Sequence, residues 1–266
     1  MKNTVATFAA MKTRGEKISM LTAYDYTTAR LVSDAGVNAI LVGDSLGQVM
    51  LGYSSTIAVT VEDMIHHGAA VVRGAGDALV VVDMPFMSYQ VSVEEALRNA
   101  GRIFKETGCA AVKLEGGAEI APVIRRLTAA GIPVMGHIGM MPQHVHQYGG
   151  FKMQGKSAQG ANRIVEDALA VECAGAFAVV LECIPAGVAA RITERLSIPT
   201  IGIGAGAACD GQVLVNQDML GMFADFRPKF VRRFAEAGDL MRSAFRAYDA
   251  AVKSGDFPGT DETPGS

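Results

Sequence analysis

Residues 78–85 read Ala-Leu-Val-Val-Val-Asp-Met-Pro, an apolar run that ends in a carboxylate and a proline. A short run rich in Val and Leu is typical of a strand buried on both faces, as in a parallel sheet covered by helices. Seven similar runs, the last of them weak, predict strands at residues 18–25, 39–45, 110–117, 133–139, 177–184, 199–206 and 211–216.

Helical patterns lie between these runs, at residues 27–36, 61–75, 92–107, 118–130, 160–175 and 186–197. Ser92 stands three residues before Glu95, the spacing of a capping box, and Gly108 follows at a suitable position for a helix end. Eight strands alternating with helices over about 250 residues predict an α/β fold of the (β/α)8 or TIM barrel type. A doubly wound open sheet is the main alternative.

Polar side chains at the carboxyl ends of the runs favour the barrel. They are Asp44, Asp83, Lys113 with Glu115, His137 and Glu182. In a closed barrel these ends converge on one face, where barrel enzymes place their chemistry, whereas an open sheet would spread them along an edge.

We expect one domain, with a barrel and C-terminal helices over residues 1–255 and a disordered tail over 256–266. The C-terminal helical pattern covers residues 228–254. Two long segments, 46–60 and 140–159, follow strands that carry candidate site residues. We predict that both are lids, because long loops in compact domains are often functional.

The composition excludes several classes of protein. Half of the 266 residues are hydrophobic and 19% are charged, so disorder is not the default state. The net charge of −3 gives no sign of a nucleic-acid or membrane-surface partner, and no apolar run reaches the length of a membrane span.

The mean hydropathy of +0.24 is high for a soluble monomer, which favours a homo-oligomer. The four cysteines form no C-x-x-C pair, which indicates a reducing, cytoplasmic compartment.

Three of the strand-end residues are carboxylates on successive strands. Asp44, Asp83 and Glu115 would repel one another in one cavity unless a cation compensates, and oxygen ligands of this kind suit Mg²⁺. Lys113 stands two residues before Glu115, so both side chains face the same way and Lys113 can take the carboxylate of an anionic substrate. The alternative is a set of ion pairs in the barrel core.

Glu182 and His137 are the remaining candidates. Glu182 has apolar neighbours on its strand, which raise the pKa of a carboxyl group and suit a general base, although an ion pair with a nearby Arg would also explain it. His137 can hydrogen-bond a substrate oxygen, or can be a satisfied core residue.

Motifs spread from about Thr4 to Pro258 resemble those of the ketopantoate hydroxymethyltransferase (3-methyl-2-oxobutanoate hydroxymethyltransferase) family. The matching stretches are residues 21–25 (LTAYD), 42–47 (VGDSLG), 83–86 (DMPF), 112–117 (VKLEGG), 136–139 (GHIG), 149–152 (GGFK), 181–185 (LECIP), 201–206 (IGIGAG) and 210–212 (DGQ). Together they are specific, whereas any one of them would be a weak signal. Met140-Met141 stand where the family pattern leads us to expect Leu-Thr, which affects loop detail.

The resemblance implies an enzyme of pantothenate and coenzyme A biosynthesis. It implies transfer of a hydroxymethyl group from 5,10-methylenetetrahydrofolate to 3-methyl-2-oxobutanoate, which gives 2-dehydropantoate (ketopantoate) through a Mg²⁺-stabilised enolate. It further implies one Mg²⁺ per subunit and a homodecamer built as a pentamer of dimers.

The resemblance also implies roles for individual residues. Asp44 and Asp83 match metal ligands, and Glu115 matches the residue that completes the metal's shell. Asp44, Ser45, Asp83 and Lys113 match residues that contact the oxo acid. We add His137 to these substrate-binding candidates, and Glu182 matches the proposed catalytic base.

Two other readings stay open. One is a barrel enzyme of the phosphoenolpyruvate mutase and isocitrate lyase kind, which typically has a K-x-C-G-H loop that the sequence lacks. The other is a non-catalytic barrel that acts as a binding or assembly subunit. Four acidic residues at one barrel mouth argue against it.

Overall fold

The structure is a computed structural model that describes residues 2–223 and 228–264. The chain divides into two units, Met1–Val215 and Asn216–Ser266.

The first unit is built on eight parallel strands that close into a barrel. In chain order they are β1 (Ile18–Thr22), β2 (Ala39–Val42), β3 (Leu79–Asp83), β4 (Ala111–Glu115), β5 (Val134–Gly139), β6 (Ala178–Glu182), β7 (Thr200–Ile203) and β8 (Gly211–Leu214). Each strand pairs with the next, and β8 pairs with β1 to close the ring. The predicted TIM barrel is therefore confirmed, and each of the eight apolar runs contains one strand.

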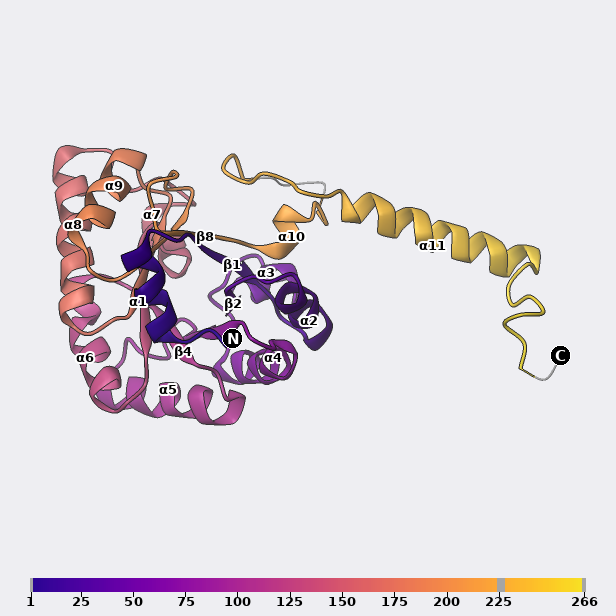
Figure 1. The fold of residues 1–266 in the computed structure, drawn as a ribbon, viewed down its shortest axis with the longest axis horizontal. Coiled ribbons are helices and arrows are strands. Elements are labelled where there is room, and N and C mark those ends of the chain that lie inside the picture. The colour runs from indigo at the N-terminus through magenta and orange to yellow at the C-terminus, as the bar shows by residue number, and fades with distance from the viewer. Residues whose placement is uncertain (1, 224–227, 265–266) are drawn as a thin grey trace. The chain divides into compact units, whose positions relative to one another are not determined.

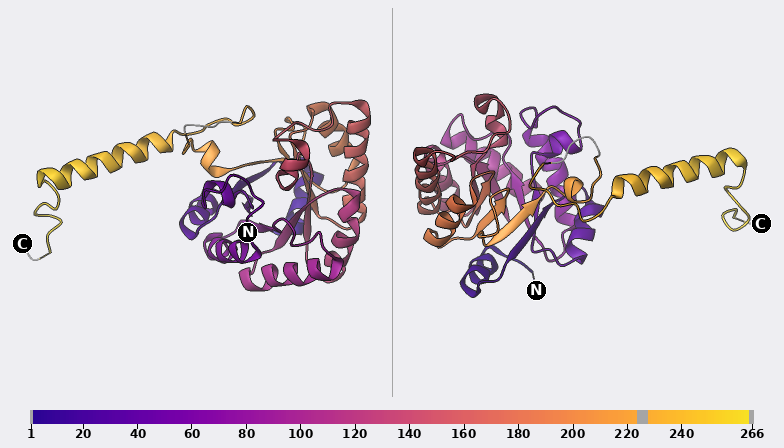
Figure 2. Two further views of the ribbon diagram at one scale, coloured as in Figure 1. Left: turned by 180° about the vertical axis from the view of Figure 1, so that it is seen from behind. Right: turned by 90° about the horizontal axis from the view of Figure 1, so that it is seen from above.

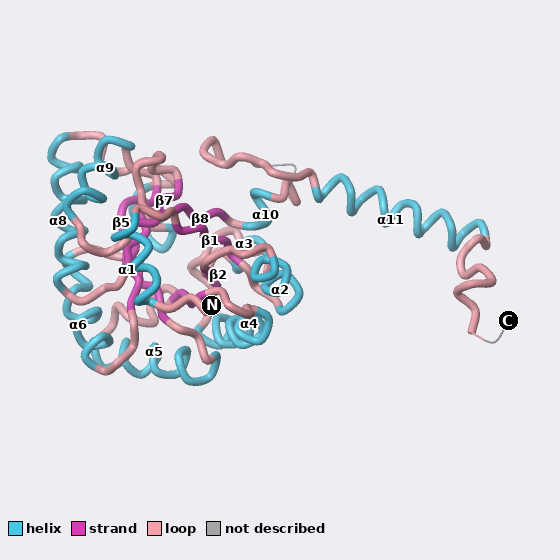
Figure 3. The backbone as a smooth tube through the Cα atoms, in the orientation of Figure 1, coloured by secondary structure: helices cyan, strands magenta, loops and turns pink. Residues whose placement is uncertain are grey.

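Helices surround the strands in Figures 1 and 3. In this unit they are α1 (Val5–Arg14), α2 (Tyr26–Asp34), α3 (Leu46–Val49), α4 (Val61–Gly74), α5 (Val93–Thr107), η1 (Ala118–Ile120), α6 (Ala121–Ala129), η2 (Pro142–His144), α7 (Val145–Tyr148), α8 (Ala158–Cys173) and α9 (Ala186–Arg195). The Ser92 side chain caps α5 by accepting from the Glu95 N–H, and Gly108 ends that helix with φ 74°. All six predicted helical segments are confirmed, although the segment 118–130 begins with the 3₁₀ turn η1.

Two apolar layers hold the barrel. The outer layer fills the space between strands and helices, and the inner layer consists of inward-facing side chains such as Leu41, Val81 and Met135. Phe8 and Met11 of α1 belong to the inner layer, so this helix closes the amino-terminal end of the barrel (Figure 2). With that end filled by side chains, the carboxyl ends of the strands form the opposite face.

The second unit contains α10 (Asn216–Met219) and α11 (Ala237–Ser254). The prediction of a helix beginning at residue 228 is wrong, because α11 begins at Ala237 after Glu236, whose φ of −117° and ψ of 58° are not helical. In residues 228–236 backbone groups form hydrogen bonds outside a helical pattern. The Phe234 N–H, for example, donates to the Met219 carbonyl. Residues 256–264 form no helix or strand, 265–266 lie outside the described residues, and the disorder of 256–266 stays a prediction.

The long segments after β2 and β5 contain only short helical turns, α3 in the first and η2 with α7 in the second. That they act as lids stays a prediction. Among the described residues, no helix is long and apolar enough to cross a membrane.

Candidate active site

The barrel brings the predicted polar residues together at the carboxyl ends of its strands. Asp44 follows β2, and the others lie on β3 to β6. The register pairs Asp83 with Lys113 and Glu115 with His137, and it places Glu182 opposite Gly139. Five of these residues are at most 3% exposed, namely Asp44, Asp83, Lys113, Glu115 and His137.

Four of them form a line of close contacts across neighbouring strands. Lys113 Nζ lies 3.1 Å from Asp83 Oδ1 and 3.0 Å from His137 Nδ1. On the other side of the imidazole, His137 Nε2 lies 3.2 Å from Glu182 Oε2 and 3.1 Å from the Met140 carbonyl oxygen. The line thus joins Asp83 on β3 to Glu182 on β6.

The contacts of His137 determine its tautomer. The Lys113 ammonium can only donate, so Nδ1 of His137 accepts and the ring hydrogen is on Nε2. Burial, reinforced by the Lys113 charge, lowers the pKa of His137 well below its ordinary value. A neutral His137 therefore donates its Nε2–H to the Met140 carbonyl, and Glu182 Oε2 lies 3.2 Å from the same nitrogen.

The carboxyl groups carry large electrostatic perturbations. Burial raises the pKa of Glu182 to about 8, against the opposing effect of Lys113. Burial and the Asp83 charge raise the pKa of Asp44 to about 7, and burial and the Asp44 charge raise that of Glu115 well above its usual range. Burial would lower the pKa of Lys113, but the surrounding carboxylates raise it to about 12. One lysine therefore faces four acidic groups, an excess of negative charge.

This excess fits a divalent cation. Asp44 follows β2 and Asp83 ends the neighbouring strand β3, and the Asp44 N–H donates to Asp83 Oδ2 at 3.0 Å. The buried Glu115 Oε1 receives no hydrogen bond from a described residue, and the partner of Asp83 Oδ1 among the described residues is the Lys113 ammonium at 3.1 Å. Carboxylate oxygens are hard ligands, and such oxygens with lone pairs to spare suit Mg²⁺.

Few protein side chains are placed to act as ligands of a metal ion here. In the described part of the chain, no group of three or more His, Cys, Asp or Glu residues could hold a metal ion together. Mg²⁺ is usually bound by one or two carboxylates, with water and substrate oxygens completing its shell. Asp44 and Asp83 fit that arrangement, and the metal roles of these residues and of Glu115 stay predictions.

Ser45 lies beside the carboxylates at the start of α3. Its Oγ is 2.8 Å from the hydroxyl of Tyr24, which is 1% exposed and whose pKa burial raises well above the ordinary value. The sequence reasoning quoted Tyr24 within a motif but gave it no role. In the structure the Tyr24 hydroxyl holds the Ser45 side chain in position.

Gln143 is the residue that the sequence reasoning missed. It lies in η2 of the segment after β5, is 4% exposed, and donates from Nε2 to Asp44 Oδ2 at 2.9 Å. Its backbone N–H donates to Glu115 Oε2 at 3.0 Å, and its Oε1 accepts from the Tyr89 hydroxyl at 2.7 Å. Gln143 thus holds two of the carboxylates in place. A search for charged strand ends cannot find a neutral amide in a loop, and its place in the predicted lid was the only signal.

Known proteins resemble this chain in sequence and in fold. A sequence model of the family described as ketopantoate hydroxymethyltransferase matches residues 2–260. The chain is 60% identical over 258 residues to 3-methyl-2-oxobutanoate hydroxymethyltransferase of Clostridium novyi (strain NT), covering 97% of this chain and 94% of that one. It is 59% identical over 262 residues to the protein of the same name from Syntrophus aciditrophicus (strain SB), covering 98% and 96%.

Solved structures with the same fold are much more distant in sequence. Phosphonopyruvate hydrolase, in a complex with oxalate and Mg²⁺, has a TM-score of 0.64 at 11% identity and covers 98% of this chain and 93% of its own. A 2,3-dimethylmalate lyase of the phosphoenolpyruvate mutase and isocitrate lyase superfamily has a TM-score of 0.61 at 15% identity, covering 99% and 93%. At these identities the likeness is one of fold.

Proposed function

The chain belongs to the ketopantoate hydroxymethyltransferase family, and from that premise we propose that it takes its one-carbon unit from 5,10-methylenetetrahydrofolate and acts through a Mg²⁺-stabilised enolate of 3-methyl-2-oxobutanoate. The family identifies a hydroxymethyltransferase that makes ketopantoate. The donor, the metal and the residue roles are the proposal. In the overall balance one water supplies the hydroxyl oxygen, and tetrahydrofolate leaves.

The observation that carries the proposal is the line from Asp83 through Lys113 and His137 to Glu182, in which neighbours lie within 3.2 Å. In this proposal Asp83 binds the cation at one end of the line, and Glu182 is the base at the other. Lys113 lies between them and binds the substrate carboxylate by charge. This arrangement separates the group that orients the oxo acid from the group that removes its proton.

Glu182 is the base in this proposal. A pKa of about 8 makes it a stronger base than an ordinary carboxylate, and such a pKa lies near the working pH. His137 Nε2 lies 3.2 Å from the Oε2 of Glu182. Glu182 removes the proton from C3 of the oxo acid, and the electron pair of that C–H bond then forms the new bond to the methylene carbon of the donor.

The carboxylates of Asp44 and Asp83 would hold Mg²⁺, with Glu115 beside them. When bound there, the metal would act as a Lewis acid toward the 2-oxo group and stabilise the negative charge that develops as the C3 proton leaves. Ser45, held by Tyr24, and Lys113 would contact the oxo acid.

Proton exchange tests the proposal. With enzyme, Mg²⁺ and 3-methyl-2-oxobutanoate in D₂O, we expect the proton NMR signal of C3–H to disappear at a rate that depends on the metal. If no exchange occurs either without or with tetrahydrofolate, the proposed enolate is refuted.

We also propose a cytoplasmic homo-oligomer, a decamer by family likeness. In α11, Met241, Phe245, Tyr248 and Val252 follow one another at spacings of four, three and four residues and are 40–64% exposed. Such a stripe is the seam by which helices of two chains associate. Light scattering of the full chain tests this, and a monomeric mass would refute it.

A further inference from the structure

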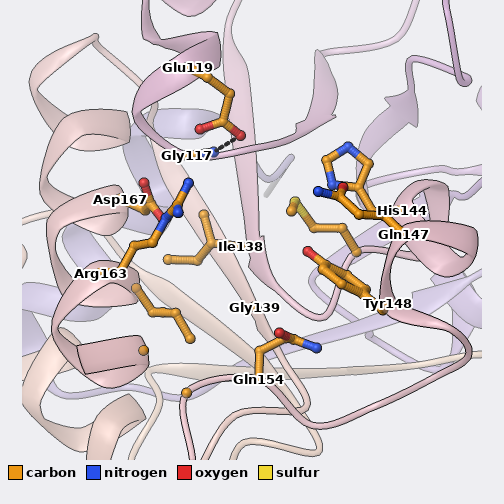
Figure 4. A pocket seen from close by; sticks show the side chains of 14 residues that line it. Gly117, Glu119, Ile138, Gly139, His144, Gln147, Tyr148, Gln154, Arg163 and Asp167 are labelled. Carbon is orange, nitrogen blue, oxygen red and sulfur yellow. Dashed lines mark hydrogen bonds between the residues drawn. The ribbon is translucent and has the colours of Figure 1, made fainter. Parts of the chain in front are cut away.

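A cavity of about 440 Å³ lies beside the line of site residues. Its walls come from the turn after β4, the end of β5, the segment after β5 and the helix α8. Figure 4 shows Arg163 and Asp167 of α8 on one side of the space and Tyr148 with Gln147 on the other. The cavity volume is in the range of small-molecule sites.

The walls are the immediate neighbours of the proposed catalytic residues. Ile138 and Gly139 follow His137 on β5. Gln154 lines the cavity, and its N–H donates to the carbonyl of Cys183, the residue after Glu182. Tyr148 lines the cavity from α7, which directly follows the turn of Gln143, the partner of Asp44 and Glu115. A molecule in this cavity would therefore lie close to the reacting oxo acid.

The charges of the walls indicate what kind of molecule fits. Glu119 and Asp167 are acidic, Arg163 is basic, and Gln147 and Gln154 are neutral amides. Two carboxylates disfavour a phosphate or another compact anion. They favour a ligand with an edge of N–H donors, because a carboxylate accepts two parallel N–H bonds.

Asp167 is the best placed of these groups. It is half-buried, burial raises its pKa, and its Oδ1 accepts from the Ala118 N–H at 3.0 Å. No other hydrogen bond to this carboxylate comes from a described residue, so it can accept more. A Cβ at Gly117 would clash with the carboxylate, so only glycine lets this turn approach so closely. Arg163, one turn before Asp167 on α8, acts on this carboxylate through its charge.

We propose that this cavity binds the reduced pterin ring of the one-carbon donor, with Asp167 accepting from the ring's 2-amino and N3–H groups and Tyr148 stacking against the ring. Arg163 lies one turn from Asp167 on α8, and its charge acts on that carboxylate. The inference rests on the proposed function for the identity of the donor.

Calorimetry with tetrahydrofolate tests the assignment. Asp167→Asn keeps an oxygen for the Ala118 N–H but loses the charge, so we expect the Kd to rise about tenfold or more. Glu166→Gln on the same helix is the matched control, because Glu166 is exposed and does not line the cavity. It should bind like the wild type. An unchanged Kd in Asp167→Asn would overturn the proposal.

Two fragments separate ring from tail. We expect 6-methyltetrahydropterin to displace tetrahydrofolate, and p-aminobenzoylglutamate to displace it much less. The reverse order would overturn the assignment of the ring to this cavity. If Asp167→Asn does not fold, Tyr148→Ala gives the same test through lost stacking, with several-fold weaker binding expected and unchanged binding contradicting the proposal.

The C3 proton exchange without donor separates this inference from the proposed function. We expect Asp167→Asn to exchange the proton of 3-methyl-2-oxobutanoate at the wild-type rate while losing donor affinity. A wild-type protein that exchanges the proton but does not bind tetrahydrofolate would refute the cavity assignment and leave the enolate chemistry standing. A wild-type protein that binds tetrahydrofolate through Asp167 but never exchanges the proton would refute only the enolate chemistry.

Discussion

Glu182→Gln gives the sharpest test of the catalytic assignment, because the structure predicts that it changes the rate and little else. The Glu182 side chain is 13% exposed, and its Oε2 lies 3.2 Å from Nε2 of His137. A Gln side chain fills nearly the same volume beside His137. Since burial raises the pKa of Glu182 to about 8, the group is mostly protonated at pH 7 without ligands, and a neutral amide resembles it. We therefore expect stability to change by less than about 1 kcal/mol.

The expected effect on the rate is much larger. A positioned base contributes roughly 10²- to 10⁴-fold, and Gln cannot take a proton. The assay is the rate of C3 proton loss from 3-methyl-2-oxobutanoate in D₂O, followed by NMR at saturating Mg²⁺. Calorimetry of oxo acid binding accompanies it, and affinity should stay within a few-fold of the wild type. Glu194→Gln on α9, an exposed position, is the control and should exchange normally.

A loss of less than tenfold in Glu182→Gln with intact binding would refute the reasoning. The base would then be another group. A loss of rate accompanied by an equal loss of oxo acid affinity would also contradict it, because the residue would then be acting in binding.

Four further outcomes are expected. The exchange rate should fall as the pH falls below about 8, since a raised pKa leaves Glu182 protonated and unable to act as a base, and a flat profile between pH 6 and 9 would contradict this. Asp83→Ala should abolish metal-dependent exchange, and normal turnover in the purified variant would remove Asp83 from the metal site. Gln143→Leu should weaken the apparent Mg²⁺ affinity by roughly tenfold, because Asp44 loses its 2.9 Å amide partner, whereas an unchanged Mg²⁺ titration would leave Gln143 a structural role only. Lys113→Met should lower the free energy of unfolding by about 3 kcal/mol, as it leaves buried carboxylates without their cation, and urea denaturation with an unchanged midpoint would argue against that.

Much of the barrel was predictable because its signals are local. A parallel strand covered on both faces must be apolar along its length, so each strand left a run of Val, Ile, Leu or Ala in the sequence. The placement of site residues such as Asp83 and Glu182 followed from topology, since closing a parallel sheet brings all carboxyl ends to one face. The helix start at Ala237 was not predictable in this way. Residues 228–236 have helical composition, but their backbone groups bond to other partners, such as the Met219 carbonyl.

The sequence by itself determined the closed sheet, the face that carries the chemistry and the side chains that end the strands there. The tertiary structure decided how these side chains pair, which nitrogen of His137 carries the hydrogen, and that Gln143 bonds to Asp44 from 99 residues away. It also decided that Asp167 and Tyr148 line one cavity. The reason is physical: hydrophobic periodicity reports which face of an element is buried, whereas a hydrogen bond between distant segments depends on loop paths and strand register, which exist only once the chain has closed.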